Sequence, residues 1–190
     1  MTRYTSCSFI ACDFSRAAIE VLKQNPLYDP QKCNVFVADP AHNPLPVASE
    51  SVDIATMIFM LSAVNPCLMP AALAHVYRTL RPGGALLFRD YGVCDLTHVR
   101  FIAKGHRKLD ENFYVRGDGT RTYFFSLEKV QSLLQEAGFE TEAVQYDTRE
   151  LKNRKRKIIM PRVWVHAIGR KPLSPCPGES SESAGESSVT

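Results

Sequence analysis

The chain has 190 residues, enough for one ordinary domain that buries roughly 70% of its unfolded surface. Its net charge of +3 hides an asymmetry, because residues 179–190 hold three Glu and no Lys or Arg and leave residues 1–178 at +6. A mildly basic body is compatible with nucleic acid but does not require it. No apolar run reaches about 18 residues, which excludes a transmembrane helix and predicts no membrane partner.

The cysteines and histidines do not form a metal or disulfide pattern. The six cysteines are scattered without paired spacing, so a structural zinc site and a secreted disulfide framework are both excluded. The five histidines fall on different expected elements without ligand spacing, which predicts no metal. The first residues lack the apolar segment of a secretory leader. We therefore expect reduced thiols and a cytoplasmic location, with the mitochondrion and the nucleus left open.

Apolar runs and amphipathic segments alternate along the chain, which is typical of an α/β domain with a doubly wound, mostly parallel sheet. The expected strands are Phe9–Cys12, Cys33–Ala38, Val52–Phe59, Ala85–Phe88, Phe139–Tyr146 and Arg162–Ile168. The expected helices are Arg16–Gln24, the segment from Pro70 to Leu80, and Leu127–Ala137.

Three segments have special features in this pattern. Val52–Phe59 is almost continuously apolar, so we expect a strand that is buried on both faces. Residues 92–122 show no clear period and are too long for a simple connection, which indicates a functional insertion. Ser, Glu, Gly and Pro dominate from Pro172 onward, so residues 172–190 are expected to be a disordered tail after a domain of residues 1–171.

An acidic residue follows each of the first two expected strands, Asp13 after the first and Asp39 after the second. Ligands of doubly wound sheets collect at the carboxyl ends of the strands. Carboxylates placed there can accept hydrogen bonds from ribose hydroxyls or from an adenine amino group. Acids after strands are also common as helix caps or surface residues, so the pattern by itself leaves both interpretations open.

Two stretches are far more specific, namely Phe88-Arg89-Asp90-Tyr91-Gly92 and the segment Asn112–Arg121. They closely resemble the S-adenosylmethionine-dependent methyltransferases that make 3-methylcytidine in the anticodon loop of tRNA. The resemblance extends from about Ile10 to about Lys171. It implies a Rossmann-like class I methyltransferase fold, S-adenosyl-L-methionine as cofactor and tRNA as partner, with an accessory protein left open as a second partner.

The resemblance also assigns cofactor-binding residues. Asp13 matches the acid that binds the ribose, and Asp39 matches the acid on the adenine side. Ile58 begins the run Ile58–Val64, whose first residue packs on the cofactor in the family. Pro40 departs from the pattern, because the family usually has Leu after the acid; the change alters local backbone donors and keeps the carboxylate.

Methylation of cytosine N3 needs little acid–base chemistry, because this nitrogen has a free lone pair and no proton to lose. Catalysis therefore depends on positioning and electrostatics. The product base is cationic, so a nearby anion would bind the transition state better than the ground state. Asp90 is our candidate for that anion. Tyr91 or Phe113 could stack on a flipped base. The alternative is that Arg89 and Asp90 form a structural ion pair.

The insertion combines basic and aromatic residues, a mixture that suits RNA because phosphates bind Arg and Lys while exposed bases stack on rings. The candidates for RNA contacts are Arg89, Phe113, Tyr114, Arg116 and Arg121. A second basic run, Lys152–Lys157, could contact a tRNA stem, act as a nuclear address or be a solvated hairpin tip.

The family's first strand and glycine-rich loop have no counterpart upstream of Phe9. In the family this strand lies between those that match Phe9–Cys12 and Val52–Phe59, so we expect a gap in the sheet and little methyl transfer by this chain alone. Three functions compete: a tRNA cytidine-N3 methyltransferase, a catalytically dead RNA-binding remnant or isoform, and a methyltransferase for a small molecule or protein. The basic, aromatic insertion weakens the third, because a small substrate would not need it.

Overall fold

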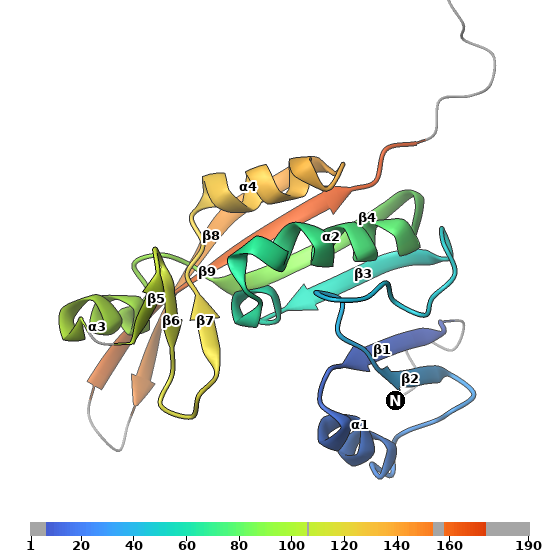
Figure 1. The fold of residues 1–190 in the computed structure, drawn as a ribbon, viewed down its shortest axis with the longest axis horizontal. Helices are drawn as coiled ribbons and strands as arrows, with labels where there is room; N and C mark the ends of the chain where they lie inside the picture. Colours follow the sequence, from blue (N-terminus) through green and yellow to red (C-terminus); the bar gives the residue numbers. More distant parts are fainter. Residues whose placement is uncertain (1–6, 106, 154–157, 174–190) are drawn as a thin grey trace, which may run out of the picture.

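A computed structural model describes residues 7–105, 107–153 and 158–173 (Figure 1). Its strands are β1 (Phe9–Asp13), β2 (Cys33–Val37), β3 (Val52–Ile58), β4 (Leu80–Tyr91), β5 (Lys108–Asp110), β6 (Phe113–Val115), β7 (Arg121–Tyr123), β8 (Glu140–Asn153) and β9 (Ile158–Arg170). Its α-helices are α1 (Arg16–Lys23), α2 (Met69–Thr79), α3 (Leu96–Lys104) and α4 (Leu127–Glu136). Two short 3₁₀ helices, η1 (Leu61–Ala63) and η2 (Pro66–Leu68), precede α2. Most of the expected disordered tail and of the basic run Lys152–Lys157 lies outside the described residues.

The main sheet has the strand order β3-β4-β9-β8. Strand β3 pairs with β4 in parallel, and β9 pairs with both β4 and β8 in antiparallel fashion, so β3, β4 and β8 run in one direction and only β9 runs against them. Strands β1 and β2 form a separate parallel pair, and β5, β6 and β7 form a small antiparallel sheet. The expected α/β class with a mostly parallel sheet is confirmed.

Helices α2 and α4 cover one face of the main sheet (Figure 1). Each has an apolar stripe because its buried residues recur every three or four positions, as in Leu73 and Val76 of α2. Ser126 begins α4 by accepting a hydrogen bond from the Lys129 backbone N–H (3.2 Å). The apolar core lies between these helices and the inward side chains of the sheet, including Leu86 and Val165.

Strand β3 is an edge strand, which corrects the expectation that it is buried on both faces. Met57 points toward α2 and is buried, whereas Ile54 is 60% exposed and Ile58 is 56% exposed on the other face. The apolar run is real, but β3 has β4 as its one partner among the described residues. Figure 1 shows β1, β2 and α1 beyond this edge as a separate unit. The expected gap between β1 and β3 is therefore present in the described part of the chain.

Strand β4 is longer than the sequence predicted. It begins at Leu80, and the Arg81–Gly84 turn is a break in its pairing with β3, where Gly83 has a φ of +76°. At the other end β4 continues past Phe88 because Asp90 and Tyr91 pair with β9. This extension places both residues inside the sheet instead of in a loop.

The insertion at residues 92–122 is folded, with α3 followed by β5, β6 and the start of β7. It is fixed to the main sheet by Asp95, whose carboxylate is fully buried. One oxygen of Asp95 accepts a hydrogen bond from Thr97 N–H (2.8 Å), and the other accepts from Arg162 Nε (2.7 Å) and Val163 N–H (3.0 Å) on β9. Because a buried charge is tolerated when it is paired and hydrogen-bonded, this contact holds the insertion against β9.

The difference in burial between the two faces of the sheet can be tested by replacing one side chain on each face with alanine. Leu86→Ala removes a fully buried side chain and should lower the free energy of unfolding by about 2–5 kcal/mol. Ile54→Ala on the exposed face should cost less than about 1 kcal/mol. Urea unfolding of both variants measures the difference. Equal losses would show that the Ile54 face is covered in solution.

Candidate functional site

The two strand-end acids lie side by side at the carboxyl ends of β1 and β2. Asp13 ends β1 opposite Val37, and Asp39 follows β2 by two residues. Asp13 Oδ1 accepts a hydrogen bond from the Ser15 backbone N–H at 2.7 Å. Asp39 accepts one from Ala41 N–H at 2.9 Å, and its second oxygen lies 2.9 Å from His42 Nδ1. Both acids therefore lie at the ends of neighbouring strands, and their role in binding a cofactor stays a prediction.

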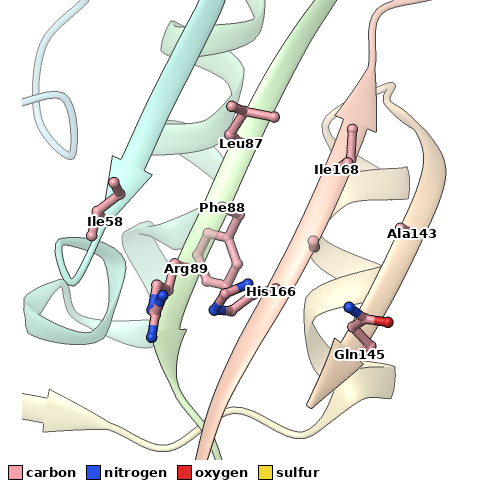
Figure 2. Close-up of a pocket in the computed structure, with 9 residues that line it drawn as sticks. Ile58, Leu87, Phe88, Arg89, Ala143, Gln145, His166 and Ile168 are labelled. Atoms are coloured by element: carbon pink, nitrogen blue, oxygen red, sulfur yellow. The ribbon is translucent and has the colours of Figure 1, made fainter. Parts of the chain in front are cut away.

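Ile58 lies in a different environment, at the carboxyl end of β3. Its side chain lines a cavity of about 300 Å³ on the open face of the main sheet (Figure 2). The cavity is formed by residues of the main sheet alone, and neither Asp13 nor Asp39 lines it. The expectation of one cleft that joins all three residues is therefore not met among the cavities of the described residues, and the cofactor role of Ile58 stays a prediction.

A row of four residues crosses the sheet at this cavity, because Ile58, Arg89, His166 and Gln145 are register partners on neighbouring strands. Arg89 Cζ lies 4.4 Å from the centre of the Trp164 ring. Its Nη2 lies 3.4 Å from Asp147 Oδ2. Burial, with the nearby Arg89 cation, lowers the pKa of His166 despite the Asp147 carboxylate. The row is thus apolar at β3 and polar across the rest of the sheet.

Arg89 and Asp90 do not pair with each other. Successive side chains of a strand point to opposite faces, so Arg89 faces the cavity while Asp90 faces the helices. Arg89 pairs with Asp147 instead. Sequence reasoning missed Asp147, because its link to Arg89 depends on the pairing of β8 with β9 and of β9 with β4.

The Asp90 carboxylate is fully buried, which corrects its expected position facing a substrate. One oxygen accepts a hydrogen bond from Ser62 N–H in η1 (2.9 Å), and the other accepts from Tyr91 N–H (2.9 Å). Burial raises the pKa of Asp90 to about 6, while these hydrogen bonds oppose the increase. Asp90 therefore acts in this structure as a positioning residue that joins η1 to the end of β4.

Tyr91 lies between two groups from distant parts of the chain. The ring of Phe59 is 4.9 Å from the Tyr91 ring centre, and Arg116 Cζ is also 4.9 Å from it. Arg116 Nη2 donates to Thr122 Oγ1 at 3.3 Å. Sequence reasoning chose Tyr91 and Arg116 but missed Phe59, which reads in the sequence as the last residue of an apolar strand. The feature that distinguishes Phe59 is its backbone conformation, with a φ of +53°.

Phe113 and Tyr114 are each only 4% exposed, although the sequence predicted exposed rings. Tyr114 stacks on Phe101 with ring centres 5.0 Å apart, and Phe113 packs 6.3 Å from Tyr123. The rings are buried because they hold α3 and the small sheet together. Arg121 at the start of β7 is exposed, as expected of a residue that contacts RNA. A role of the two rings in base stacking stays a prediction.

Within the described ranges, no three His, Cys, Asp or Glu side chains lie close enough to hold a metal ion. None of the helices in this described part of the chain has the length and apolarity needed to cross a membrane.

Comparison with known proteins identifies the class of this fold. A methyltransferase domain family matches residues 1–84. A solved S-adenosylmethionine-dependent methyltransferase from Methanosarcina mazei superposes with a TM-score of 0.65 and 21% identity, over 88% of this chain and 83% of that one. The YcgJ protein of Bacillus subtilis gives a TM-score of 0.64 at 15% identity, with the same shares covered. The fold is that of a class I methyltransferase.

Curated relatives narrow this class to a family. The chain is 46% identical to the human tRNA N(3)-cytidine methyltransferase METTL6 over 164 residues, which are 85% of this chain and 57% of that protein. It is 46% identical to the tRNA N(3)-methylcytidine methyltransferase Mettl2 of Drosophila melanogaster, over 85% of this chain and 50% of the relative. O-methyltransferase 3 of Dictyostelium discoideum is 48% identical over 87% of this chain and 38% of its own length.

The chain is thus a relative of tRNA N(3)-cytidine methyltransferases over most of its length, in agreement with its resemblance in sequence. It spans about half the length of these curated relatives.

The buried carboxyl of Asp90 predicts a specific pH dependence of stability. Its pKa in the folded protein is raised from 3.8 to about 6, so the folded state holds the proton more tightly than the unfolded chain does. The contribution of Asp90 to the free energy of unfolding should therefore fall by about 2 kcal/mol as the pH rises from about 4.5 to about 7.5. Asp90→Asn should remove this component, which urea unfolding of both proteins at pH 4.5 and 7.5 would measure. Parallel changes in the two proteins would contradict the assignment.

Proposed function

We propose that this chain is the S-adenosylmethionine-dependent catalytic part of a tRNA cytidine-N3 methyltransferase. The observation that carries the proposal is the pair of carboxylates at the neighbouring ends of β1 and β2, together with an aromatic and basic group at the end of β4. In that group Arg89 and Tyr91 belong to β4, and Arg116 packs over the Tyr91 ring from the segment after β6. The first feature suits a nucleoside cofactor and the second suits RNA. The names of the METTL6 and Mettl2 relatives support the same substrate.

The described residues fit one half of the proposed cofactor. Asp13 and Asp39 are both accessible carboxylates, and each can accept hydrogen bonds from the hydroxyls or the amino group of an adenosine. The methionine half would need a backbone cradle, which glycine usually provides, and the first glycine of the sequence is Gly83 in β4. We therefore assign the adenosine contacts to this chain and derive no step at the methionine end.

The chain's own residues act on the base rather than on the methyl donor. Bound S-adenosylmethionine would supply the methyl group to the lone pair of cytosine N3, which needs no general base. The reaction makes the base cationic, and the faces of aromatic rings attract cations. The rings of Phe59 and Tyr91 therefore take the charge-stabilising role that the sequence assigned to Asp90. Asp90 acts behind them by holding the Tyr91 backbone.

A second candidate is methyl transfer to oxygen on a small molecule, which the name of the Dictyostelium discoideum relative favours. A remnant that binds RNA without catalysis is a third. The expected cytoplasmic location and the accessory protein stay predictions.

The decisive experiment offers the purified chain labelled S-adenosylmethionine with either unmodified tRNA or a set of small phenols. The proposed function requires label in tRNA from the longer form of the chain, located at cytidine N3 by nucleoside mass spectrometry, and little label is expected from the 190-residue chain alone. Label in the phenols alone would favour the second candidate. Tight tRNA binding without label in either substrate would favour the RNA-binding remnant. A longer form of the chain, tested in parallel, shows whether the methionine end requires further residues.

The adenosine contacts predict a loss of cofactor affinity in Asp13→Asn. A hydrogen bond to a charged group contributes about 1.5–3 kcal/mol, so binding of S-adenosylhomocysteine in calorimetry should weaken about tenfold or more. Asp29→Asn is a matched control, because Asp29 makes the same bond to a backbone N–H two residues ahead, at 2.9 Å. Equal affinities of the Asp13→Asn and Asp29→Asn proteins would remove Asp13 from the cofactor site.

The RNA contacts predict a change in the salt dependence of tRNA binding. Arg121→Ala should weaken binding and lower the salt slope by about one phosphate contact. Arg81→Ala is the control, because Arg81 is also exposed but lies near the start of β4 and pairs with Asp53 at 2.8 Å. An unchanged slope in Arg121→Ala, measured by filter binding at several salt concentrations, would place the RNA site elsewhere.

A further inference from the structure

Phe59 combines a strained backbone with an accessible ring. Its φ of +53° lies in the left-handed region, which bulky residues rarely adopt. The conformation is held by a hydrogen bond from Phe59 N–H to the Arg89 carbonyl (2.8 Å), directly after the last residue of β3. Such strain persists where the surrounding structure imposes it, and it occurs often at functional sites. The backbone therefore turns the ring away from the strand at the ligand side of the sheet.

Packing alone does not account for this ring. Phe88, Phe113, Phe124 and Phe125 are all at most 4% exposed, whereas Phe59 is 38% exposed. Phe59 has neighbours only along part of its surface: Tyr91 at 4.9 Å and Trp164 at 6.3 Å between ring centres. An aromatic ring that is fixed by its backbone and left partly open is suited to stack on a flat ligand.

Two arginines lie near the ring, one in direct contact with it and one by way of Tyr91. Arg89 Cζ lies 5.9 Å from the Phe59 ring centre, and Arg116 reaches Phe59 through Tyr91. The Nε atoms of Arg89 and Arg116 are both buried without an acceptor among the described residues. A buried donor without a partner costs free energy, which a ligand that brings an acceptor would recover. Figure 2 shows Arg89 on the same face as Ile58 and His166.

We propose that Phe59 is the stacking platform for one unpaired base of an RNA strand, with Arg89 and Arg116 binding the phosphates on either side. The class of ligand rests on the proposed function. Arginines interleaved with aromatic rings are the usual surface for single-stranded nucleic acid, where every base offers a flat face to a ring. Paired RNA hides these faces, so the platform selects loops over stems.

The test separates the contribution of the base to binding from that of the sugar-phosphate backbone. One probe is a labelled oligoribonucleotide of about eight positions in which a single cytidine stands among abasic residues, and the other probe is abasic throughout. Fluorescence anisotropy without cofactor gives the ratio of the two affinities. The wild-type chain should bind the cytidine probe about tenfold more tightly, since stacking of one base contributes about that factor.

Substitutions test whether the Phe59 ring is responsible for this ratio of affinities. Phe59→Leu should bring the ratio close to one and leave the affinity for the abasic probe unchanged, which also shows that the variant is folded. Phe59→Tyr should keep the ratio. Phe14→Leu is the matched control, because Phe14 is 74% exposed in the loop before α1, and it should keep the ratio too. Arg89→Gln should weaken both probes equally and lower the salt slope by about one phosphate contact.

A wild-type ratio near one, no binding of either probe, or an unchanged ratio in Phe59→Leu would overturn the platform. Because no methyl donor is present, these results are independent of catalysis. An intact ratio together with a longer form of the chain that does not methylate tRNA would leave the platform standing and remove the proposed function.

Discussion

The alternation of side chains at the end of β4 is the constraint on which the site depends. It sends Asp90 into the core, where the carboxylate holds Ser62 and the Tyr91 backbone, and it sends Arg89 and Tyr91 to the open face. A shift of one residue in register would exchange these roles and bury an arginine instead. The pairing of β4 with β9 fixes the register over seven consecutive residue pairs. The placement of Arg89, Asp90 and Tyr91 thus follows from sheet formation.

Much of the fold could be predicted because the apolar periodicity of this chain is strong. The strands β1, β2 and β3 and the helices α1, α2 and α4 lie within a residue or so of their expected bounds. The gap beside β3 was expected, but its exposed face was not, because an apolar run does not show which of its two faces another element covers. The folded insertion was missed for a different reason: its strands of three residues are too short to show a period.

Some positions in the site could be predicted from the sequence and others could not. The positions of Asp13 and Asp39 follow from the rule that parallel strands end at one edge, so spacing was sufficient. The burial of Asp90, Phe113 and Tyr114 depends on tertiary packing, and a motif gives the identity of a residue without its exposure. Phe59 was missed because its importance comes from a backbone angle, which no pattern of residue types encodes.

The packing of Trp164 has an optical consequence. It is the sole tryptophan of the chain, and its ring centre lies 4.4 Å from Arg89 Cζ and 5.7 Å from Arg162 Cζ. Its indole N–H is buried without an acceptor among the described residues. Indole emission responds to nearby charge and hydrogen bonding, and all tryptophan fluorescence of this protein comes from one place, beside the aromatic and basic end of β4. The chain therefore carries its own spectroscopic reporter of any event at that surface.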